Sequence, residues 1–571
     1  MRKGLWFSPR THLASNSCTS LCTAIEAGWP GGTLKQDRKY DVVVVGTGAA
    51  GLSAALKARL LGASVLVVDK GAVAGGTTAM SGGCIWAPRH HYQAQMGVTD
   101  SREAVLEYIR EVSPDGWHNT EEPLWSAFVD SVPEMLLFLE EATPLKFTPN
   151  REPDPYSEAP GGLTFGRNVS AAPLRIGILG RWRDKVRPAS FDIRLNYEEM
   201  VDTFFYANPK KWAFRYGPRL AWRHLMNMRT KGNALSIGLL KGCLDNGIDI
   251  WLETPAQRLI QKEGATVGLE VERAGEAVSI HAAKGVILAS GGFEWNLEMM
   301  AEHFPWPVEW TASPPTNTGD GQRMAEAVGA RLDKMDQALV MGTSPITYEG
   351  QLQGLPAADY FLPHSMIVNR YGKRFVNEKQ MNVGLAFTEK DPATGEPLHL
   401  PAWRIYDHQF SVKYPHAMPK NALPGNRFEA DTLEKLAQQI DVDATGLIET
   451  ARNFSDFART GVDEDFGRGS TVWDRNRGGD PDHKPNPTLG TIEQPPFYAM
   501  PFKASFLSTK GGARTNEFAE VLDRDDRIIP GLYAAGNVMA NSFGSKGVGA
   551  GTTLGPCLTW GYIAGLNAAS R

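Results

Sequence analysis

Residues 40–69 read YDVVVVGTGAAGLSAALKARLLGASVLVVD, and this stretch decides the fold of the domain that contains it. Val42–Val45 is a run of four valines, typical of a parallel strand that is buried on both faces. A glycine turn, an alanine-rich helical segment and a second apolar run ending in Asp69 follow. This order of strand, turn, helix, strand and acid predicts a unit that binds a dinucleotide.

Each glycine of the turn has its own physical role in such a unit. Gly46 permits a tight turn, Gly48 lets the backbone approach a pyrophosphate, and Gly51 allows close packing of helix against strand. The helix that begins here directs its first N–H groups, at Ala49 and Ala50, and the positive end of its dipole towards the phosphates. The turn therefore predicts a phosphate-binding helix N-terminus.

A second glycine- and hydroxyl-rich stretch, GAVAGGTTAMSGG (residues 71–83), comes almost directly after Asp69. Asp69 is placed to accept hydrogen bonds from ribose hydroxyls. The stretch can wrap the rest of a cofactor larger than a nicotinamide dinucleotide, and the alternative is an ordinary surface loop. The candidate cofactor contacts in this region are Lys70, Gly76, Thr77, Thr78, Ser81, Gly82 and Gly83.

The other end of the chain supplies a matching second half. Residues 529–565 read IPGLYAAGNVMANSFGSKGVGAGTTLGPCLTWGYIAG, a short strand, a glycine-rich loop and a helix of small residues over 557–569. The N-terminus of that helix can stabilise negative charge on a reduced flavin. We therefore predict FAD, held non-covalently because no histidine lies in a recognisable flavin-attachment context. Further candidate contacts are Gly291, Asp320, Gly536, Asn537, Thr553 and Leu554.

The two halves predict an α/β protein with a discontinuous, Rossmann-like FAD-binding domain. We expect residues 38–300 and 505–571 to form that domain, because the apolar strand at 285–292 and the C-terminal segment would rejoin the first sheet. Residues 301–504 are then an inserted α+β substrate domain, and ligands would bind at the domain interface. Residues 1–37 read as a disordered or leader-like tail.

Composition narrows the possible partners and location. The 571 residues carry 59 basic and 64 acidic side chains, which gives neither a nucleic-acid nor an anionic-membrane signature. The sequence contains no uninterrupted stretch of about 18 apolar residues, so we predict no membrane span. The five cysteines are scattered, and Cys18 and Cys22 have no second pair to complete a metal site, so we expect no metal and a reducing, cytoplasmic location.

One basic amphipathic stretch, at residues 212–229 (WAFRYGPRLAWRHLMNMR), is expected to be a helix that covers the domain. The alternative is a helix that touches a membrane surface or a partner protein.

Several ordered blocks resemble the 3-ketosteroid dehydrogenases, within the flavoprotein group that includes the soluble fumarate reductases. The blocks are GGFEWN (291–296), NTGDGQRMAEAVGA (317–330), MIVNRYGKRFVNE (366–378), PAWRIYDHQF (401–410), GVDEDFGRG (461–469), KPNPTLG (484–490), STKGGARTNEFAEVLDRDDRIIPGLYAAGN (508–537) and GTTLGPCLTWGYIAG (551–565). The resemblance implies an FAD-dependent enzyme that introduces a double bond next to a ketone in a steroid or other bulky alicyclic substrate. It implies proton removal by a tyrosine and hydride transfer to flavin N5, followed by reoxidation by an unknown acceptor.

The sequence departs from this family at two of three catalytic tyrosines. Gly547 stands where the family has its carbonyl-polarising tyrosine, and Asn382 stands near the position of its tyrosine base. The third aromatic position is matched by Tyr156, and the backbone N–H donor is kept as Gly551. Catalysis by Tyr156 and Gly551 is what the resemblance implies for this chain.

Other side chains must then supply the missing acid–base groups. We consider Tyr360, His364 and Lys546 as replacements, whereas Lys510 fits a structural or flavin-edge role better. Two other functions stay open: a reductase of activated alkenes in the fumarate-reductase manner, and a flavoprotein without catalytic activity.

Overall fold

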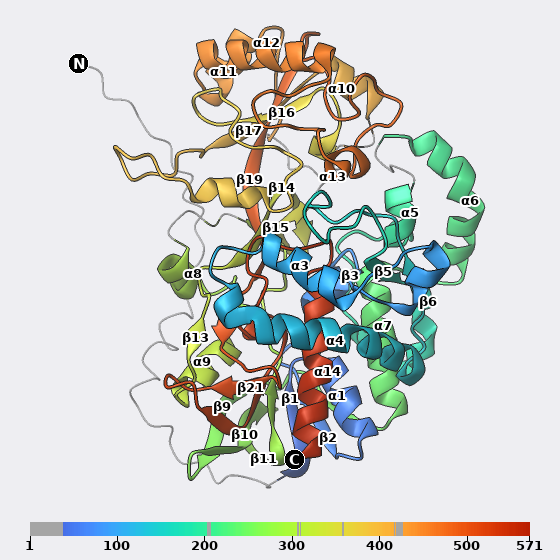
Figure 1. Cartoon of the computed structure of the whole chain (residues 1–571), viewed down its shortest axis with the longest axis vertical. Helices are drawn as coiled ribbons and strands as arrows, with labels where there is room; N and C mark the ends of the chain where they lie inside the picture. Colours follow the sequence, from blue (N-terminus) through green and yellow to red (C-terminus); the bar gives the residue numbers. More distant parts are fainter. Residues whose placement is uncertain are drawn as a thin grey trace.

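The computed structural model describes residues 38–202, 207–304, 308, 310–356, 359–415, 417 and 426–571. The predicted tail, with Cys18 and Cys22, lies outside these residues. Two sheets dominate the described part of the chain, one near the C-terminus in Figure 1 and one at the opposite end of the molecule. The cofactor motifs belong to the first sheet and the inserted segment builds most of the second.

The first sheet combines segments from both ends of the chain. Its parallel core has the order β22 (Ile528–Ala534), β11 (Glu276–Leu288), β1 (Arg38–Val45), β2 (Val65–Val68) and β8 (Asp249–Trp251). The four valines of β1 are buried, as expected for a central strand. The predicted discontinuous α/β fold is confirmed, because β22 joins a sheet that β1 begins.

Helices α1 (Ala49–Leu60) and α14 (Leu554–Ser570) pack on this sheet with their backbones in close approach (Figure 1). A Cβ atom at Gly561 would lie 2.2 Å from a carbonyl oxygen of α1, and one at Gly565 would lie 2.3 Å from another. The predicted small-residue helix is confirmed. Its glycines let α14 approach the helix that begins at the dinucleotide turn.

Further elements complete the surroundings of this sheet. Helix α7 (Lys231–Asp245) precedes β8, and β9 (Ala256–Lys262) and β10 (Ala265–Arg273) form an antiparallel hairpin beside β11. The glycine-rich stretch at 71–83 is not entirely a loop, because it contains α2 (Gly76–Met80). This short helix turns the stretch back onto the end of β1.

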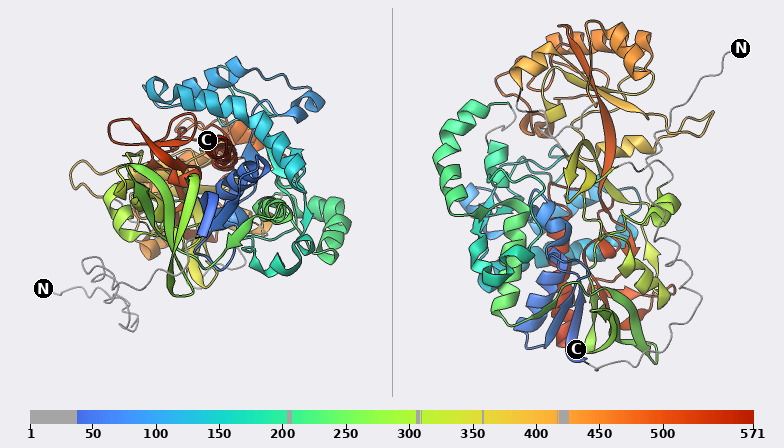
Figure 2. Two further views of the ribbon diagram at one scale, coloured as in Figure 1. Left: turned by 90° about the horizontal axis from the view of Figure 1, so that it is seen from below. Right: turned by 180° about the vertical axis from the view of Figure 1, so that it is seen from behind.

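The second sheet is organised around the long strand β19 (Phe497–Thr509), which Figures 1 and 2 show running from the outer sheet towards the cofactor domain. Its main path has the order β15 (Gln351–Pro356), β14 (Ala338–Tyr348), β19, β17 (Ala402–Asp407) and β16 (Ser365–Val368), and neighbours on this path pair antiparallel. The predicted boundary at residue 504 lies inside β19. The two parts of the molecule are thus joined by an unbroken strand.

The remaining elements extend the two sheets, form small sheets of their own, or cover and connect the two sheets. The helices are α3 (Arg102–Val112), α4 (His118–Ala142), α5 (Tyr197–Asp202), α6 (Pro209–Leu225), α8 (Leu297–His303), α9 (Asp320–Ala327), α10 (His408–Lys413), α11 (Leu433–Ile440), α12 (Ala444–Thr460) and α13 (Val472–Asn476). The short strands are β3 (Cys84–Trp86), β4 (Phe147–Pro149), β5 (Asn168–Ala171), β6 (Leu174–Arg175), β7 (Met228–Arg229), β12 (Trp310–Thr311), β13 (Leu332–Asp333), β18 (Phe428–Ala430), β20 (Gly512–Ala513) and β21 (Glu520–Leu522).

Helix α6 corresponds to the predicted basic amphipathic helix. It buries Tyr216 and Arg223, whereas Phe214 is 92% exposed and Leu225 is 81% exposed. The helix therefore lies at the edge of the molecule, as Figure 1 shows, and covers little of the core. Across the described ranges, no helix combines the length and the apolar character needed to cross a bilayer.

Candidate active site

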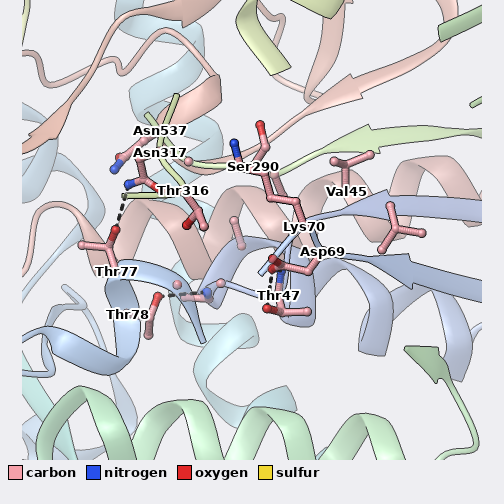
Figure 3. A pocket seen from close by; sticks show the side chains of 18 of the residues that line it. Val45, Thr47, Asp69, Lys70, Thr77, Thr78, Ser290, Thr316, Asn317 and Asn537 are labelled. Atoms are coloured by element: carbon pink, nitrogen blue, oxygen red, sulfur yellow. Dashed lines mark hydrogen bonds between the residues drawn. The ribbon is translucent and has the colours of Figure 1, made fainter. Parts of the chain in front are cut away.

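A cavity opens where β1 and β2 end and α1 begins (Figure 3). The predicted cofactor residues that line it are Gly46, Gly48, Ala49, Ala50, Asp69, Lys70, Gly76, Thr77, Thr78, Gly291, Asp320 and Asn537. The structure thus brings the two sequence halves and the inserted segment to one cleft at the carboxyl ends of parallel strands, where such sheets bind ligands.

The glycine turn has the shape that a pyrophosphate requires. A Cβ atom at Gly48 would face open space, its nearest neighbour being the Thr78 hydroxyl at 3.8 Å. In contrast, a Cβ atom at Gly51 would lie 2.0 Å from the Gly46 carbonyl oxygen, and Gly46 itself has φ of +114°. Gly46 and Gly51 therefore serve the backbone geometry, and Gly48 leaves the cleft open to a ligand.

The hydroxyl of Thr78 and the carboxylate of Asp69 both brace this turn. Thr78 accepts a hydrogen bond from the Ala49 N–H at 3.0 Å, so this helix donor is already used within the protein. Asp69 accepts from the N–H and the hydroxyl of Thr47, at 2.8 and 2.6 Å (Figure 3), and from the Gly71 N–H at 2.8 Å. Asp69 still lines the cleft, and its binding to ribose stays a prediction.

Lys70 and Asp320 form an ion pair on the cleft wall. The Lys70 ammonium donates to Asp320 at 2.6 Å and to the Thr318 hydroxyl at 2.5 Å. Burial alone would raise the pKa of Asp320, but the hydrogen bond and charge of Lys70 lower it below its ordinary value. Two residues predicted separately as cofactor contacts thus fix the end of β2 against α9.

A second and larger cavity, of about 390 Å³ against about 90 Å³ for the first, lies between the cofactor sheet and β14 of the outer sheet. The two cavities share four lining residues, Thr77, Thr78, Asn537 and Cys557. Side chains of β14, among them Leu339 and Met341, give the second cavity apolar walls. The predicted residues that line it are Ser81, Gly82, Gly83, Gly551, Thr553 and Leu554. We call it the apolar cavity.

Most of the predicted catalytic side chains are placed elsewhere. Tyr156, Tyr360, His364 and Lys546 are not among the described residues that line either cavity. Tyr360 packs against Phe361 and Phe502 in the outer sheet, with ring centroids 4.5 and 5.2 Å away. The structure thus gives Tyr360 a packing position.

His364, Lys546 and Lys510 likewise have protein partners away from the apolar cavity. The Nδ1 atom of His364 lies 2.8 Å from the Thr491 carbonyl oxygen. The Lys546 ammonium lies 5.3 Å from the centre of the Tyr156 ring. The buried Lys510 ammonium donates to the Gly544 carbonyl at 2.7 Å, and burial lowers its pKa to about 8. Of the predicted catalytic groups, Gly551 is the one that reaches the cavity.

The two positions that lack the family tyrosines have structural roles here. The Asn382 side chain accepts a hydrogen bond from the Val340 N–H at 3.1 Å and donates to the Ser545 carbonyl at 2.5 Å. Asn382 therefore ties β14 to the C-terminal loop. Gly547 has φ of +69°, a backbone conformation that a tyrosine rarely adopts.

The apolar cavity also contains polar residues that the sequence did not reveal. Glu152, Tyr197, Lys231 and Arg477 line it. The Tyr197 hydroxyl donates to Glu152 at 2.7 Å, and Arg477 Nε lies 3.7 Å from the other Glu152 oxygen. Burial raises the pKa of Glu152, and Arg477 and Tyr197 offset part of that rise. Of these residues, Glu152 alone lies close in sequence to a predicted site residue, four positions before Tyr156.

Lys231 is the second cation of the apolar cavity. Its ammonium donates to the Phe191 carbonyl at 2.6 Å, and burial lowers its pKa to about 8. Lys231 has φ of +58° and directly precedes Gly232, whose Cβ atom would lie 1.9 Å from the Thr78 carbonyl oxygen. This strained backbone holds the start of α7 against the glycine-rich stretch.

Comparisons with known proteins agree with this geometry. The profile of the FAD binding domain family matches residues 41–554. The chain is 37% identical to a 3-oxosteroid 1-dehydrogenase of Mycobacterium tuberculosis, over 94% of this chain and 99% of that protein. It is 35% identical to a 4-oxocyclohexanecarboxylate 2-dehydrogenase of Sinomonas cyclohexanicum, over 93% of each chain.

The similar solved structures include a ketosteroid dehydrogenase and, with lower similarity, a fumarate reductase. The 3-ketosteroid Δ1-dehydrogenase from Sterolibacterium denitrificans, in complex with 1,4-androstadiene-3,17-dione, matches with a TM-score of 0.86 and 34% identity, over 93% of this chain and 100% of that one. A flavocytochrome c3 fumarate reductase shares the fold at a TM-score of 0.62 and 24% identity, over 97% of this chain and 80% of that one. The chain therefore belongs to the family of FAD-binding flavoproteins that includes the 3-oxosteroid 1-dehydrogenases.

Proposed function

We propose that the protein is an FAD-dependent dehydrogenase that introduces a carbon–carbon double bond next to the ketone of a steroid or other bulky alicyclic substrate. The observation that carries this proposal is the continuity of the two cavities. A polar cleft built for a dinucleotide meets a larger apolar cavity at Thr77, Thr78, Asn537 and Cys557. This arrangement suits a redox cofactor that reaches from one cavity to an apolar substrate in the other.

The residues of the cleft are suited to hold the cofactor. The open face of Gly48 and the N-terminus of α1 would accommodate the pyrophosphate, and the hydroxyls of Thr77 and Thr78 lie where the cleft meets the apolar cavity. Bound FAD supplies the two-electron acceptor that dehydrogenation needs. The seam between the cavities is therefore where we place the reaction.

The backbone of Gly551 is our candidate for polarising the substrate ketone. Gly551 lines the apolar cavity with φ of +89°, and a Cβ atom there would lie 2.4 Å from the Cys84 carbonyl oxygen. Such close approach needs glycine and fixes the peptide in place. A fixed N–H that faces a developing enolate oxygen contributes ~3–4 kcal/mol in comparable oxyanion sites.

The ring ketone is the feature that the named relatives share. Their names specify a 3-oxosteroid and a 4-oxocyclohexanecarboxylate. Apolar side chains such as Leu339, Met341 and Ile346 line the cavity and favour an alicyclic ring over a small dicarboxylate. The two cavity cations also have protein partners, Arg477 beside Glu152 and Lys231 on a carbonyl. We therefore favour a cyclic ketone over the alkene acid of a fumarate reductase.

A cytoplasmic location fits the cysteines of this enzyme. Cys84, Cys243 and Cys557 are free thiols in the described part of the chain. Free buried thiols persist in a reducing compartment.

Anaerobic reduction of the protein's flavin tests the proposed function. We expect loss of flavin absorbance on mixing with 3-oxosteroids or substituted cyclohexanones, followed by recovery with an added electron acceptor. In a parallel arm, the chemically reduced protein is mixed with fumarate and related alkene acids. Reoxidation by alkene acids alone, with no response to any ketone, would contradict the proposal.

A further inference from the structure

The wall of the apolar cavity contains a cluster of three ionisable residues that do not correspond to the catalytic tyrosines of the family. Its members are Glu152, Tyr197 and Arg477, and each comes from a different segment. Glu152 follows β4, Tyr197 is the first residue of α5, and Arg477 directly follows α13. Folding alone brings them together on the wall of the cavity that Gly551 also lines.

The two carboxylate oxygens of Glu152 have different surroundings. Oε2 accepts the hydrogen bond from Tyr197 at 2.7 Å. Oε1 accepts no hydrogen bond from any described residue, although Arg477 Nε lies 3.7 Å away. The side chain lines the apolar cavity and is 1% exposed. One oxygen of a buried carboxylate is thus left with lone pairs to accept a proton.

The backbone of Glu152 is held firmly, which gives this oxygen a defined position. The Glu152 N–H donates to the Asn150 side chain at 3.1 Å, and the Asn168 amide donates to the Glu152 carbonyl at 3.4 Å. A general base has to sit within hydrogen-bond reach of the proton that it removes, and a carboxylate on the cavity wall can come within that reach of a ligand bound against it.

On the basis of the proposed function, we propose that Glu152 is the catalytic base that removes the proton from the carbon next to the substrate ketone. The C–H bond breaks, an O–H bond forms on Glu152 Oε1, and the released electron pair moves into the enolate of the ketone. The enolate oxygen lies against the Gly551 N–H. Glu152 thereby takes the role that the family assigns to the tyrosine near position 382.

The groups around Glu152 favour a carboxylate base over a tyrosinate. Burial and the Glu152 charge raise the pKa of Tyr197 well above its ordinary value, so its hydroxyl stays neutral and donates. The Arg477 charge and this hydrogen bond lower the pKa of Glu152, whereas burial and Asp154 raise it. Burial also keeps the nearby Cys84 thiol protonated, because it raises the pKa of that thiol. Tyr197 and Arg477 are therefore positioning residues.

The test separates proton removal from net dehydrogenation. The holoenzyme, with its flavin chemically reduced and oxygen excluded, is incubated in D₂O with a cyclic ketone that bleaches the oxidised enzyme. Deuterium entering the carbon next to the ketone is followed by NMR. We expect Glu152→Gln to slow this exchange by about 100-fold or more, the usual contribution of a general base. FAD content and ketone binding should stay at the wild-type level, and the exposed Glu107→Gln serves as the control.

Exchange at the wild-type rate in Glu152→Gln would overturn the assignment of the base and leave the proposed function standing. A wild-type enzyme that neither exchanges protons nor bleaches with any ketone would overturn both. If Glu152→Gln does not fold, Tyr197→Phe gives the answer. Without the Tyr197 hydrogen bond the pKa of Glu152 rises, so the acid limb of the exchange rate should move to higher pH. An unmoved limb would also overturn the assignment.

Discussion

The dinucleotide cleft and the apolar cavity meet at shared residues, but the sequence encodes them in different ways. The cleft is built mainly from contiguous motifs, with Gly46, Gly48 and Asp69 within one stretch of chain. The polar groups of the apolar cavity, such as Glu152 and Arg477, come from segments far apart in sequence. A cofactor with constant chemistry is recognised by a constant local motif, whereas the substrate is recognised by side chains that only the fold assembles.

The largest effect that we expect is on stability and FAD binding, from a substitution at Gly51, the glycine that lets α1 pack against β1. In Gly51→Ala the new Cβ atom would lie 2.0 Å from the Gly46 carbonyl oxygen, so β1 and α1 must move apart. We expect a loss of about 1–3 kcal/mol in the free energy of unfolding, as for other overpacked cores, together with loss of FAD. Thermal unfolding of the apoprotein measures the first effect. Gly177→Ala, with nothing within 4 Å of the new atom, is the control and should unfold like the wild type.

Gly48→Ala, in the same turn, should separate the effect on FAD binding from the effect on stability. Its Cβ atom would meet no protein atom closer than 3.8 Å, so the apoprotein should unfold at the wild-type temperature. The methyl group would instead occupy the space predicted for the pyrophosphate, and we expect FAD affinity to fall at least about tenfold, or ~1.4 kcal/mol. Titration of apoprotein with FAD measures this. Wild-type affinity would contradict the pyrophosphate assignment.

A larger side chain in the apolar cavity should weaken substrate binding and leave FAD binding unchanged. Leu339→Trp adds bulk to the cavity wall on β14. We expect ketone binding to weaken by about 1–3 kcal/mol, as for overpacking elsewhere, with FAD content unchanged. Leu352→Trp on the neighbouring strand β15, 45% exposed in the wild type, is the matched control. Equal ketone affinity in both variants would place the substrate outside this cavity.

The smallest effects should come from two residues that the sequence suggested as catalytic and that the structure places outside both cavities. Tyr156→Phe and His364→Gln change side chains that lie outside both cavities. We expect rates of flavin reduction within about twofold of wild type, well below the tenfold change that ~1.4 kcal/mol produces. A loss of turnover with FAD retained in either variant would return that residue to the candidate catalytic groups.

The sequence predicts the cofactor half well because its signals are local. The valine run, the glycine turn and the small-residue helix each depend on neighbours within a few positions, and the structure confirms the strand and helices that they predict. Glu152, Tyr197 and Arg477 carry no comparable signal, because their proximity depends on tertiary contacts between distant segments. Asn382 shows the same limit, since its structural role depends on partners at Val340 and Ser545.

Strand β19 has a mechanical consequence for the seam between the two cavities. At its inner end, the Thr509 hydroxyl accepts from the Phe293 N–H at 2.9 Å, and the Thr509 N–H donates to Glu294 at 3.3 Å. Glu294 in turn accepts from Asn317 at 2.7 Å, and Asn317 donates to the Thr77 hydroxyl at 3.0 Å. The outer sheet is therefore connected to Thr77 by a chain of hydrogen bonds, so a movement of β19 relative to the first sheet would also shift a hydroxyl at the place where the two cavities meet.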